Sequence, residues 1–316
     1  MQLLIENNGN LIEPCIEEGV KWTTNRVGTP SILTFNMKAE ESVIIEEGKT
    51  VRLTDDNQNV FFGFIFKSKE TKKDVIPFTA YDQLRYLKNK DSYNFIGQTA
   101  SQIIKKIAKD FVLNIGEIEE TGYTIASLKK QDTSLFDIIQ SALDITLMNT
   151  KSLYTLYDDF GKLTLKNIKN TLINLQIDED VCEDYEFNKD IDSDTYNQIK
   201  LVKEDSKTKS RKVYIAKDTS NINKWGLLQM YEKLEDNENG QIKTDAMLKL
   251  KNRVFKRLSI KNALGDSRVR AGVRLMVIIK TKSTPINSIM LVDKATHTYK
   301  KDQHTMDLEL RSGEYE

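Results

Sequence analysis

The sequence predicts an α+β fold that is rich in β-strands, and three patterns support this prediction. Residues 33–37 and 306–310 alternate between apolar and polar side chains, which is the period of a strand with one buried face. Residues 97–113 and 134–148 instead place apolar side chains at helical spacing. Residues 154–165 contain two short strand-like runs around Gly161, which is typical of a hairpin.

Residues 1–90 form the first expected unit, and they consist mostly of short strands. Val51 and Leu53 continue the alternating pattern, and residues 60–66 are apolar on both faces. Within that run, Gly63 predicts a buried strand that another backbone segment approaches closely. A helix is expected near residues 81–88. Short strands at this spacing predict a small antiparallel barrel or sandwich.

Residues 91–185 form the second expected unit, which combines two amphipathic helices with a hairpin. Thr99 and Gln102 have the spacing of a capping box at the start of the first helix. Ser134 and Asp137 have the same spacing at the start of the second helix. Each helix has one apolar stripe, which is more typical of a surface that faces the core than of a partner groove. In the hairpin, Gly161 can adopt the positive φ that the turn requires.

Residues 186–316 form the third expected unit, in which strands surround two inserted helices. Helices are predicted near residues 224–234 and 241–256. No internal repeat and no Pro-rich linker marks a boundary, so the limits of the three units are soft. Strands are predicted at residues 196–202, 213–216, 258–260, 273–280, 289–292 and 306–310.

The composition excludes several classes of protein. The 316 residues contain 47 Lys and Arg against 47 Asp and Glu, so the formal net charge is zero. A neutral chain has no general attraction to nucleic acid or to an anionic membrane. No apolar run is long enough to cross a bilayer, and no basic-then-apolar signal region follows Met1. We therefore expect synthesis and folding in the cytoplasm, without secretion by a signal peptide.

Cysteine and histidine are scarce, which limits redox and metal chemistry. Cys15 and Cys182 are far apart, so neither a disulfide framework nor a Cys-based zinc site is expected, and both thiols are predicted to be buried. His297 and His304 are the only histidines. Their spacing would place them on opposite faces of one strand, so a shared metal would require a turn between them. Both are predicted to be structural.

Two short motifs match catalytic sequences but lack the remaining machinery. Asp159-Phe160-Gly161 matches the metal-binding tripeptide of protein kinases, yet no Gly-rich loop of the required spacing and no His-Arg-Asp sequence occurs. Tyr157-Asp158-Asp159 matches a polymerase metal turn without its context. Neither a Walker A sequence nor a Gly-x-Ser-x-Gly sequence is present. We therefore assign no catalytic residue, no metal ligand and no cofactor; a metal-dependent enzyme that uses Asp158 and Asp159 is a minor alternative.

The zero net charge conceals two oppositely charged segments. Residues 178–194 contain nine acids and one base, whereas residues 249–274 contain nine bases and one acid. Two interpretations are open: solvated faces, or complementary patches that meet between subunits. A nucleic-acid-binding patch on the basic segment is a third, although no interleaved aromatic residues support it. The candidate subunit-interface residues are Asp180, Asp184, Asp190, Arg253, Lys256, Arg257, Arg268 and Arg270.

Several stretches of the chain together resemble one family. Residues 81–91, from Tyr81 to Asp91, are similar to a segment of XkdQ/YqbQ-like proteins, the tail or baseplate hub components of contractile phage tails and phage-tail-like particles. The resemblance implies that Asp159-Phe160-Gly161 is part of the hairpin of that family. Further stretches resemble the same family in the same order along nearly the whole chain: residues 99–104, 135–140, 157–163, 195–201, 224–229, 269–272 and 304–308.

The resemblance implies a fold and a function. The implied fold is like that of the myophage baseplate hub, with two tube-protein-like antiparallel β-barrel domains, in residues 1–90 and 186–316, and additional helix-containing domains. Because other domains interrupt the barrels of that hub, the resemblance implies that the units of this chain can be interleaved in sequence. The implied assembly is a homotrimeric ring that joins the hexameric tail tube to the central spike and contacts the baseplate wedge proteins. It forms in the bacterial host cytoplasm, initiates the tube, and then resides in the baseplate. A distal-tail or other baseplate component is the alternative; no enzymatic activity, membrane or specific nucleic acid is implied.

Overall fold

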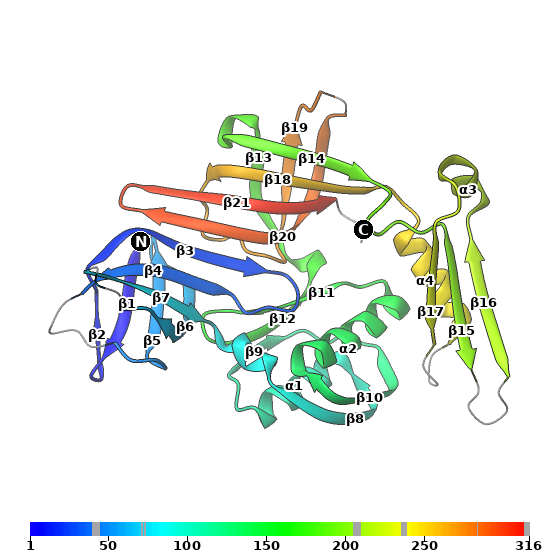
Figure 1. The fold of residues 1–316 in the computed structure, drawn as a ribbon, viewed down its shortest axis with the longest axis horizontal. Helices are drawn as coiled ribbons and strands as arrows, with labels where there is room; N and C mark the ends of the chain where they lie inside the picture. Colours follow the sequence, from blue (N-terminus) through cyan, green and yellow to red (C-terminus); the bar gives the residue numbers. More distant parts are fainter. Residues whose placement is uncertain are drawn as a thin grey trace.

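The computed structural model describes residues 1–39, 45–70, 72, 74–204, 210–234, 239–282 and 284–312. Strands predominate in these residues, and a smaller number of helices accompanies them (Figure 1). This confirms the prediction of a β-rich α+β fold. None of the helices in the described ranges is long and apolar enough to cross a membrane.

The N-terminal strands form an antiparallel arrangement around one core. They are β1 (Gln2–Asn7), β2 (Asn10–Ile12), β3 (Ile16–Asn25), β4 (Ile32–Lys38), β5 (Thr50–Asp55), β6 (Gln58–Ser68) and β7 (Val75–Tyr81). Their order is β3-β4-β7-β6-β5-β1-β2, and every neighbouring pair is antiparallel. The alternating residues Leu33, Phe35 and Met37 are buried in this core, as the strand period requires.

Gly63 lies where β6 passes close to β7. A Cβ atom at this position would be 2.3 Å from the carbonyl oxygen of Tyr81 and 2.5 Å from the ring of Phe61. Any side chain at this position would therefore displace either a backbone or a buried ring. The predicted close backbone approach at Gly63 is confirmed.

We expect Gly63→Ala to lower the free energy of unfolding by about 2 kcal/mol, because overpacking against a fixed backbone strains the core. Urea unfolding measures this loss. Gly48→Ala is the control, because Gly48 has a φ of +88° but nothing within 4 Å of its Cβ position. Its only cost is that of a side chain on left-handed backbone, so we expect it to lower the free energy of unfolding by about 1 kcal/mol. Equal losses in the two variants would contradict the steric explanation.

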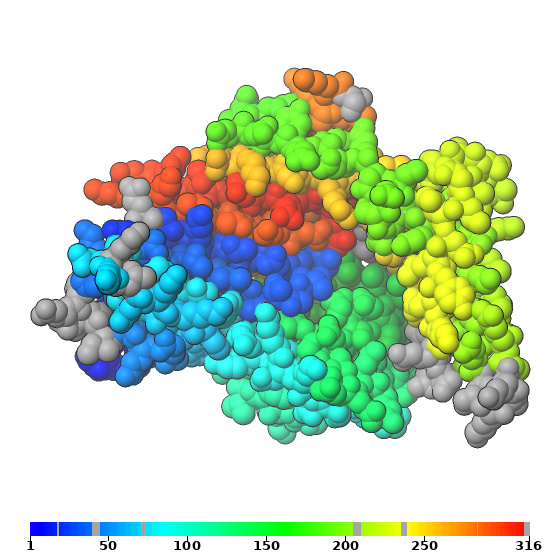
Figure 2. All heavy atoms as spheres, viewed as in Figure 1, coloured from blue at the N-terminus to red at the C-terminus, as the bar shows by residue number. Residues whose placement is uncertain are grey.

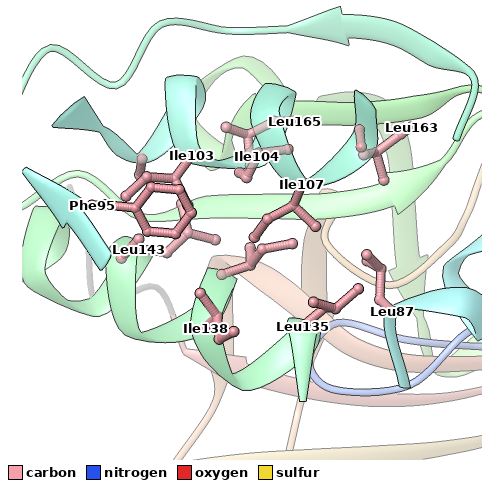
Figure 3. Packing of buried hydrophobic residues seen from close by; sticks show 14 of the residues in the cluster. Leu87, Phe95, Ile103, Ile104, Ile107, Leu135, Ile138, Leu143, Leu163 and Leu165 are labelled. Atoms are coloured by element: carbon pink, nitrogen blue, oxygen red, sulfur yellow. The ribbon is translucent and has the colours of Figure 1, made fainter. Parts of the chain in front are cut away.

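A helix-containing unit follows the N-terminal strands. It comprises the 3-10 helix η1 (Gln83–Lys88), β8 (Lys90–Thr99), α1 (Ala100–Asp110), β9 (Ile115–Ile118), β10 (Thr124–Ser134), α2 (Leu135–Thr150), β11 (Tyr154–Asp158) and β12 (Leu163–Asn167). β8 pairs with β10, while β11, β12 and β9 form a separate small sheet. Ile103 and Ile107 of α1 pack with Leu135 and Ile138 of α2 in the core that Figure 3 shows.

The two amphipathic helices begin where the sequence predicts. The hydroxyl of Thr99 accepts a hydrogen bond from the backbone N–H of Gln102, and the Gln102 side chain accepts one from the backbone of Thr99. This is the complete capping box. The hydroxyl of Ser134 accepts a hydrogen bond from the backbone N–H of Asp137 in the same way.

The C-terminal strands surround a second core. They are β13 (Leu172–Asp178), β14 (Asp184–Asp190), β18 (Phe255–Leu264), β19 (Arg274–Ile279), β20 (Ile286–Lys300) and β21 (Gln303–Ser312). Their order is β14-β18-β21-β20-β19-β13, with β13 and β19 parallel and the other pairs antiparallel. Met306, Leu308 and Leu310 are buried in this core, as their alternation predicts.

β20 joins the first strands of the chain to the last. β21 covers one edge of β20, and the other edge pairs first with β19 and then with β3. Residues 294–299 thereby lie antiparallel to residues 20–25. Thirteen strands of the described residues form one hydrogen-bonded sheet as a result. In Figure 2 the orange and red surface of the last strands lies directly against the blue surface of the first.

An insertion separates β14 from β18. It contains β15 (Gln198–Glu204), β16 (Arg211–Lys217), α3 (Thr219–Trp225), β17 (Gln229–Lys233) and α4 (Gly240–Lys251), and α4 contacts β15 and β16. The predicted helix near residues 224–234 is wrong: Gly226, with a φ of +78°, follows the end of α3, and β17 then pairs in parallel with β15. The helix predicted near residues 241–256 ends at Lys251.

The strand pairing crosses the predicted limits of the units. β13 lies within residues 91–185, yet it pairs with β19 near the C-terminus. We therefore propose that one C-terminal β unit combines residues 172–190 with residues 255–312, and that residues 195–251 interrupt it. The prediction of buried cysteines fails at Cys15, which is exposed in the connection from β2 to β3, while Cys182 is half-buried.

Candidate functional site

The two oppositely charged segments lie side by side in one chain. Asp184 and Asp190 are the first and last residues of β14, and Lys256 and Arg257 are in β18. These strands are antiparallel neighbours, and Asp184 lies opposite Lys261. Opposite charges that face each other on neighbouring strands stabilise the pairing. The segments that the sequence suggests as partners between subunits are therefore neighbours within the subunit.

Attraction between the segments is visible in individual contacts. The Lys251 ammonium is 2.5 Å from the carboxylate of Asp194, which ties the end of α4 to the acidic segment. Hydrogen bonds from Ser193 lower the pKa of Asp190, and the charge of Arg257 lowers it further. Asp180 is exposed in the short turn before β14. These intrachain contacts explain part of the charge segregation, and a role of the acids between subunits stays a prediction.

The other three candidate cations also interact within their own chain. Arg253 lies over an aromatic ring of β18, 4.8 Å from its centroid. Arg268 forms an ion pair with Asp266 at 2.5 Å. The guanidinium carbon of Arg270 is 3.1 Å from the ring centroid of Tyr157, and burial lowers the pKa of Arg270. Arg270 thus attaches the C-terminal strands to the β11–β12 hairpin instead of lying in an open patch.

A buried carboxylate holds the junction between the N-terminal strands and the helix-containing unit. Asp82, which is 1% exposed, directly follows β7 and caps η1. One of its oxygens accepts hydrogen bonds from the backbone N–H and the hydroxyl of Ser31, at 3.0 and 2.5 Å, and the other accepts from the N–H of Leu84 at 3.0 Å. Burial raises the pKa of Asp82 well above its usual range, and the charge of Asp158 adds to this effect.

Gln83 extends the junction to the hairpin. Its amide donates to the Asp158 carboxylate at 2.8 Å and also exchanges hydrogen bonds with the backbone of Asn114. Asp158 accepts a further hydrogen bond from the N–H of Gly161 at 2.6 Å, and burial raises the pKa of Asp158 to about 6. Both oxygens of Asp158 thus accept hydrogen bonds, one from η1 and one from the turn of the β11–β12 hairpin. The predicted hairpin is confirmed, with Phe160 and Gly161 both at positive φ.

Aromatic side chains complete this junction. Phe62, Phe64 and Phe66 alternate with buried residues along β6. Phe160, from the hairpin turn, lies 5.8 Å from the ring of Phe62. Tyr86, from η1, lies 6.2 Å from Phe64 and 6.0 Å from Phe66. Residues 81–91 and 157–163, two of the stretches that resemble a known family, therefore meet on the same surface of β6.

The two histidines form a pair where the first and last strands meet. The turn between β20 and β21 brings His297 Nδ1 to 2.8 Å from His304 Nε2. His297 Nε2 is 2.7 Å from the carbonyl oxygen of Val269, and His304 Nδ1 is 3.5 Å from the carboxylate of Asp55 in β5. Among the described residues, no group of three or more His, Cys, Asp or Glu is arranged to hold a metal. The pair connects β5 to the C-terminal hairpin.

Solved structures of phage tail proteins share this arrangement. The 43 kDa tail protein of prophage MuSo2 from Shewanella oneidensis matches with a TM-score of 0.74 at 11% identity, over 98% of both chains. A tail protein from Neisseria meningitidis MC58 matches with a TM-score of 0.72 at 11% identity, over 99% of this chain and 97% of that chain. The fold is therefore of the class found in phage tail and baseplate proteins.

Sequence comparison then identifies the family. A family model described as YQBQ-like matches residues 20–311. The uncharacterized protein YqbQ of Bacillus subtilis is 34% identical over 308 residues, which cover 93% of this chain and 90% of that protein. The phage-like element PBSX protein XkdQ of the same organism is 34% identical over 281 residues, covering 84% and 82%. The chain belongs to the YqbQ-like family, which confirms the resemblance.

Sequence reasoning missed the polar residues of the junction. Asp82, Gln83 and Asp158 lie within stretches that carry the family resemblance, but no chemical role is evident for them from the sequence alone. One signal was present: Asp82 stands between an apolar strand and the buried Leu84 and Leu87, which is the position of a helix N-cap. The contacts of Asp82 and Gln83 with distant segments have no such local signal.

Proposed function

We propose that this chain is the hub of a contractile phage tail or of a phage-tail-like particle. Three copies form a ring that joins the hexameric tail tube to the central spike and contacts the baseplate wedge proteins. The hub assembles in the bacterial cytoplasm, initiates the tube and then remains in the particle. A likeness in fold supports this proposal: an E. coli type VI secretion component, described as similar to the T4 tail proteins gp27 and gp5, matches with a TM-score of 0.57 at 10% identity, over 99% of this chain and 77% of that chain.

The observation that carries the proposal is the presence of two β units in one sheet. The N-terminal and C-terminal strands have separate cores, and β3 and β20 join them edge to edge. In the proposal, each unit is a tube-protein-like barrel domain. Three chains with two such domains each present a pseudo-sixfold ring, which matches the symmetry of a hexameric tube.

The copy number tests this proposal. We expect the native mass of the protein bound to its tube protein to give three copies of this chain for each tube ring, and electron microscopy of the complex to show threefold symmetry. A ring of six copies would overturn the hub assignment and support the alternative, a distal-tail component.

The contacts of Asp158 weigh against a metal-dependent enzyme. Its two carboxylate oxygens accept hydrogen bonds from Gln83 and from the backbone of Gly161. A metal bound at Asp158 would have to replace at least one of these bonds in a buried place, where an unpaired donor is costly. A nucleic-acid site on β18 is disfavoured for another reason, because the acidic strand β14 lies beside it.

Reversing three acids tests whether the acidic segment contacts another subunit. We expect the triple change Asp180→Lys, Asp184→Lys and Asp190→Lys to weaken self-association by about tenfold or more, because complementary charges orient subunits and reversed charges repel. High salt should weaken the wild-type assembly in the same direction. Analytical ultracentrifugation at several salt concentrations measures both effects.

A matched triple variant controls for net charge. Asp91→Lys, Asp245→Lys and Asp302→Lys reverse three acids in exposed positions elsewhere in the chain, and we expect wild-type association. Circular dichroism confirms that both variants are folded. If the first variant keeps the wild-type mass and salt response, the acidic segment does not contact another subunit.

A further inference from the structure

The sheet of the insertion has one face that a helix covers and one face that stays open. The insertion lies at one end of the molecule, on the right in Figure 1. α4 packs on the covered face, where Ile199, Leu201 and Met230 share a core with Met247 of α4. Because side chains alternate along a strand, the residues between these point to the opposite face, which is termed the outer face.

The outer face carries adjacent apolar side chains. Lys200 of β15, Ile215 of β16 and Tyr231 of β17 lie in one row across the three strands, and Val202 and Val213 are paired in the next row. Ile215 is 50% exposed, Tyr231 is 48% exposed and Val213 is 43% exposed. Neighbouring apolar side chains that are exposed and rimmed by polar residues mark interaction surfaces.

The charge of the outer face is positive. Its charged residues are four bases and one acid, namely Lys200, Arg211, Lys217, Lys233 and Glu204. Glu204 forms an ion pair with Lys233 at 3.0 Å, and the Arg211 guanidinium donates to the Tyr231 hydroxyl at 2.9 Å. Within the described ranges, Lys200 and Lys217 form no ion pair. The outer face therefore offers cations and apolar contacts to an acidic partner.

The opposite charge gathers at one corner of the C-terminal strands. This acidic corner, residues 179–186, comprises the 3-10 helix η3 (Glu179–Val181) and the start of β14, and it contains five exposed acids and no base. The half-buried Val181 lies among these acids. Lys261, which is opposite Asp184, forms its ion pair with Asp307 at 3.7 Å. The acidic corner thus matches the outer face in charge and also has an apolar residue.

The two surfaces are far apart within one chain. β14 begins at the acidic corner and runs toward the insertion (Figure 1), and its seven residues span about 20 Å. The outer face points away from α4, and α4 contacts α2 of the helix-containing unit. When two different surfaces of one chain complement each other but cannot meet within it, copies associate head to tail, and such contacts can close into a ring.

We propose that the outer face of the insertion binds the acidic corner of a second copy of this chain. The inference rests on the ring of the proposed function, and it names the surfaces through which neighbouring subunits meet. Lys200 and Lys217 of one subunit face Asp180 and Asp184 of the next, and Val181 lies against Ile215. Complementary charges of this kind fix the orientation of the subunits.

A cross-link identifies the occupant in assembled tail particles. A photoreactive amino acid in place of Ile215 should give an adduct of twice the mass of the chain, with residues 179–186 in the second peptide. The same group in place of Leu264, which is 71% exposed on β18, is the control and should not give this adduct. An adduct with a different tail protein, or no adduct, would overturn the inference.

The same experiment separates this inference from the hub proposal. An adduct with a different tail protein in a ring of three copies would overturn the contact and leave the hub proposal intact. The expected adduct in a ring of six copies would retain the contact and overturn the hub.

A charge swap tests the pairing itself. We expect Lys200→Glu with Lys217→Glu to weaken self-association at least tenfold, because like charges then face each other. Adding Asp180→Lys and Asp184→Lys to the same chain should restore association to within threefold of the wild type. Analytical ultracentrifugation of the chain with its tube protein measures both effects, and circular dichroism confirms that the variants are folded. A swap that fails to restore association would overturn the pairing.

A matched pair of lysines controls for net charge. Lys224 and Lys249 are exposed on α3 and α4 of the same insertion. Lys224→Glu with Lys249→Glu should leave self-association unchanged, and adding the two acid reversals to this control should weaken it. Equal weakening by the two lysine pairs would contradict the proposed surface.

Discussion

Asp82→Ala is expected to lower the free energy of unfolding by about 3 kcal/mol, because it leaves the buried backbone N–H of Leu84 and the half-buried N–H of Ser31 without an acceptor. Both groups bond the Asp82 carboxylate in the native protein. Removing a carboxylate that lies near Asp158 offsets part of this loss. Urea unfolding measures the change, and exchange of the Ser31 and Leu84 amides should accelerate even under native conditions.

Another Asp of the same stretch provides the control. Asp91 is exposed and accepts a hydrogen bond from the N–H of the next residue, so Asp91→Ala should cost about 0.5 kcal/mol or less. Asp82→Asn should fall between the two, since an amide keeps the shape but offers a single acceptor oxygen. A loss at Asp82 no larger than that at Asp91 would show that the junction does not depend on the carboxylate.

Acidification from pH 7 to pH 4 is expected to remove about 3 kcal/mol of stability through His297, at about 1.4 kcal/mol for each pKa unit. Burial, together with the charge of the neighbouring His304, lowers the pKa of His297 from 6.5 to about 4. An unfolded histidine gains its proton near its ordinary pKa. The unfolded state therefore binds more protons than the folded state below pH 6.5, and stability falls as the pH decreases toward 4.

Comparison with His297→Gln isolates this contribution from that of the carboxylates. Glutamine can donate to the Val269 carbonyl and accept from His304 without titrating. The variant should therefore lose less stability than the wild type between pH 7 and pH 4, whatever its stability at pH 7. Urea unfolding at each pH gives the two slopes. Parallel slopes would show that His297 does not control the acid sensitivity.

Local signals explain which elements could be predicted from the sequence. The capping box of Thr99 and Gln102 and the turn at Gly161 each depend on residues a few positions apart, and the structure has both. The helix expected near residues 224–234 is wrong. There Gly226 follows the end of α3, and pairing with β15, which is distant in sequence, makes the next residues a strand. Tertiary pairing overrides a weak local preference in such cases.

The candidate site was harder to predict because its contacts are non-local. Ser31 and Asp82 are 51 positions apart, and Gln83 and Asp158 are 75 positions apart. The charged segments could be recognised from composition, but composition does not show whether opposite charges meet within a chain or between chains. The pairing of β14 with β18 shows that the opposite charges meet within the chain. Only the association experiment tests whether they also meet between chains.

The pairing of β3 with β20 also determines when the subunit can finish folding. Thr23 and Thr296 face each other across this pair although 273 positions separate them. During synthesis the first strands emerge long before their partner, so one edge of β3 remains without hydrogen bonds and open to pairing with other nascent chains. Contacts of such long range also slow folding. The subunit can therefore complete its sheet only after residues 294–299 of β20 have left the ribosome.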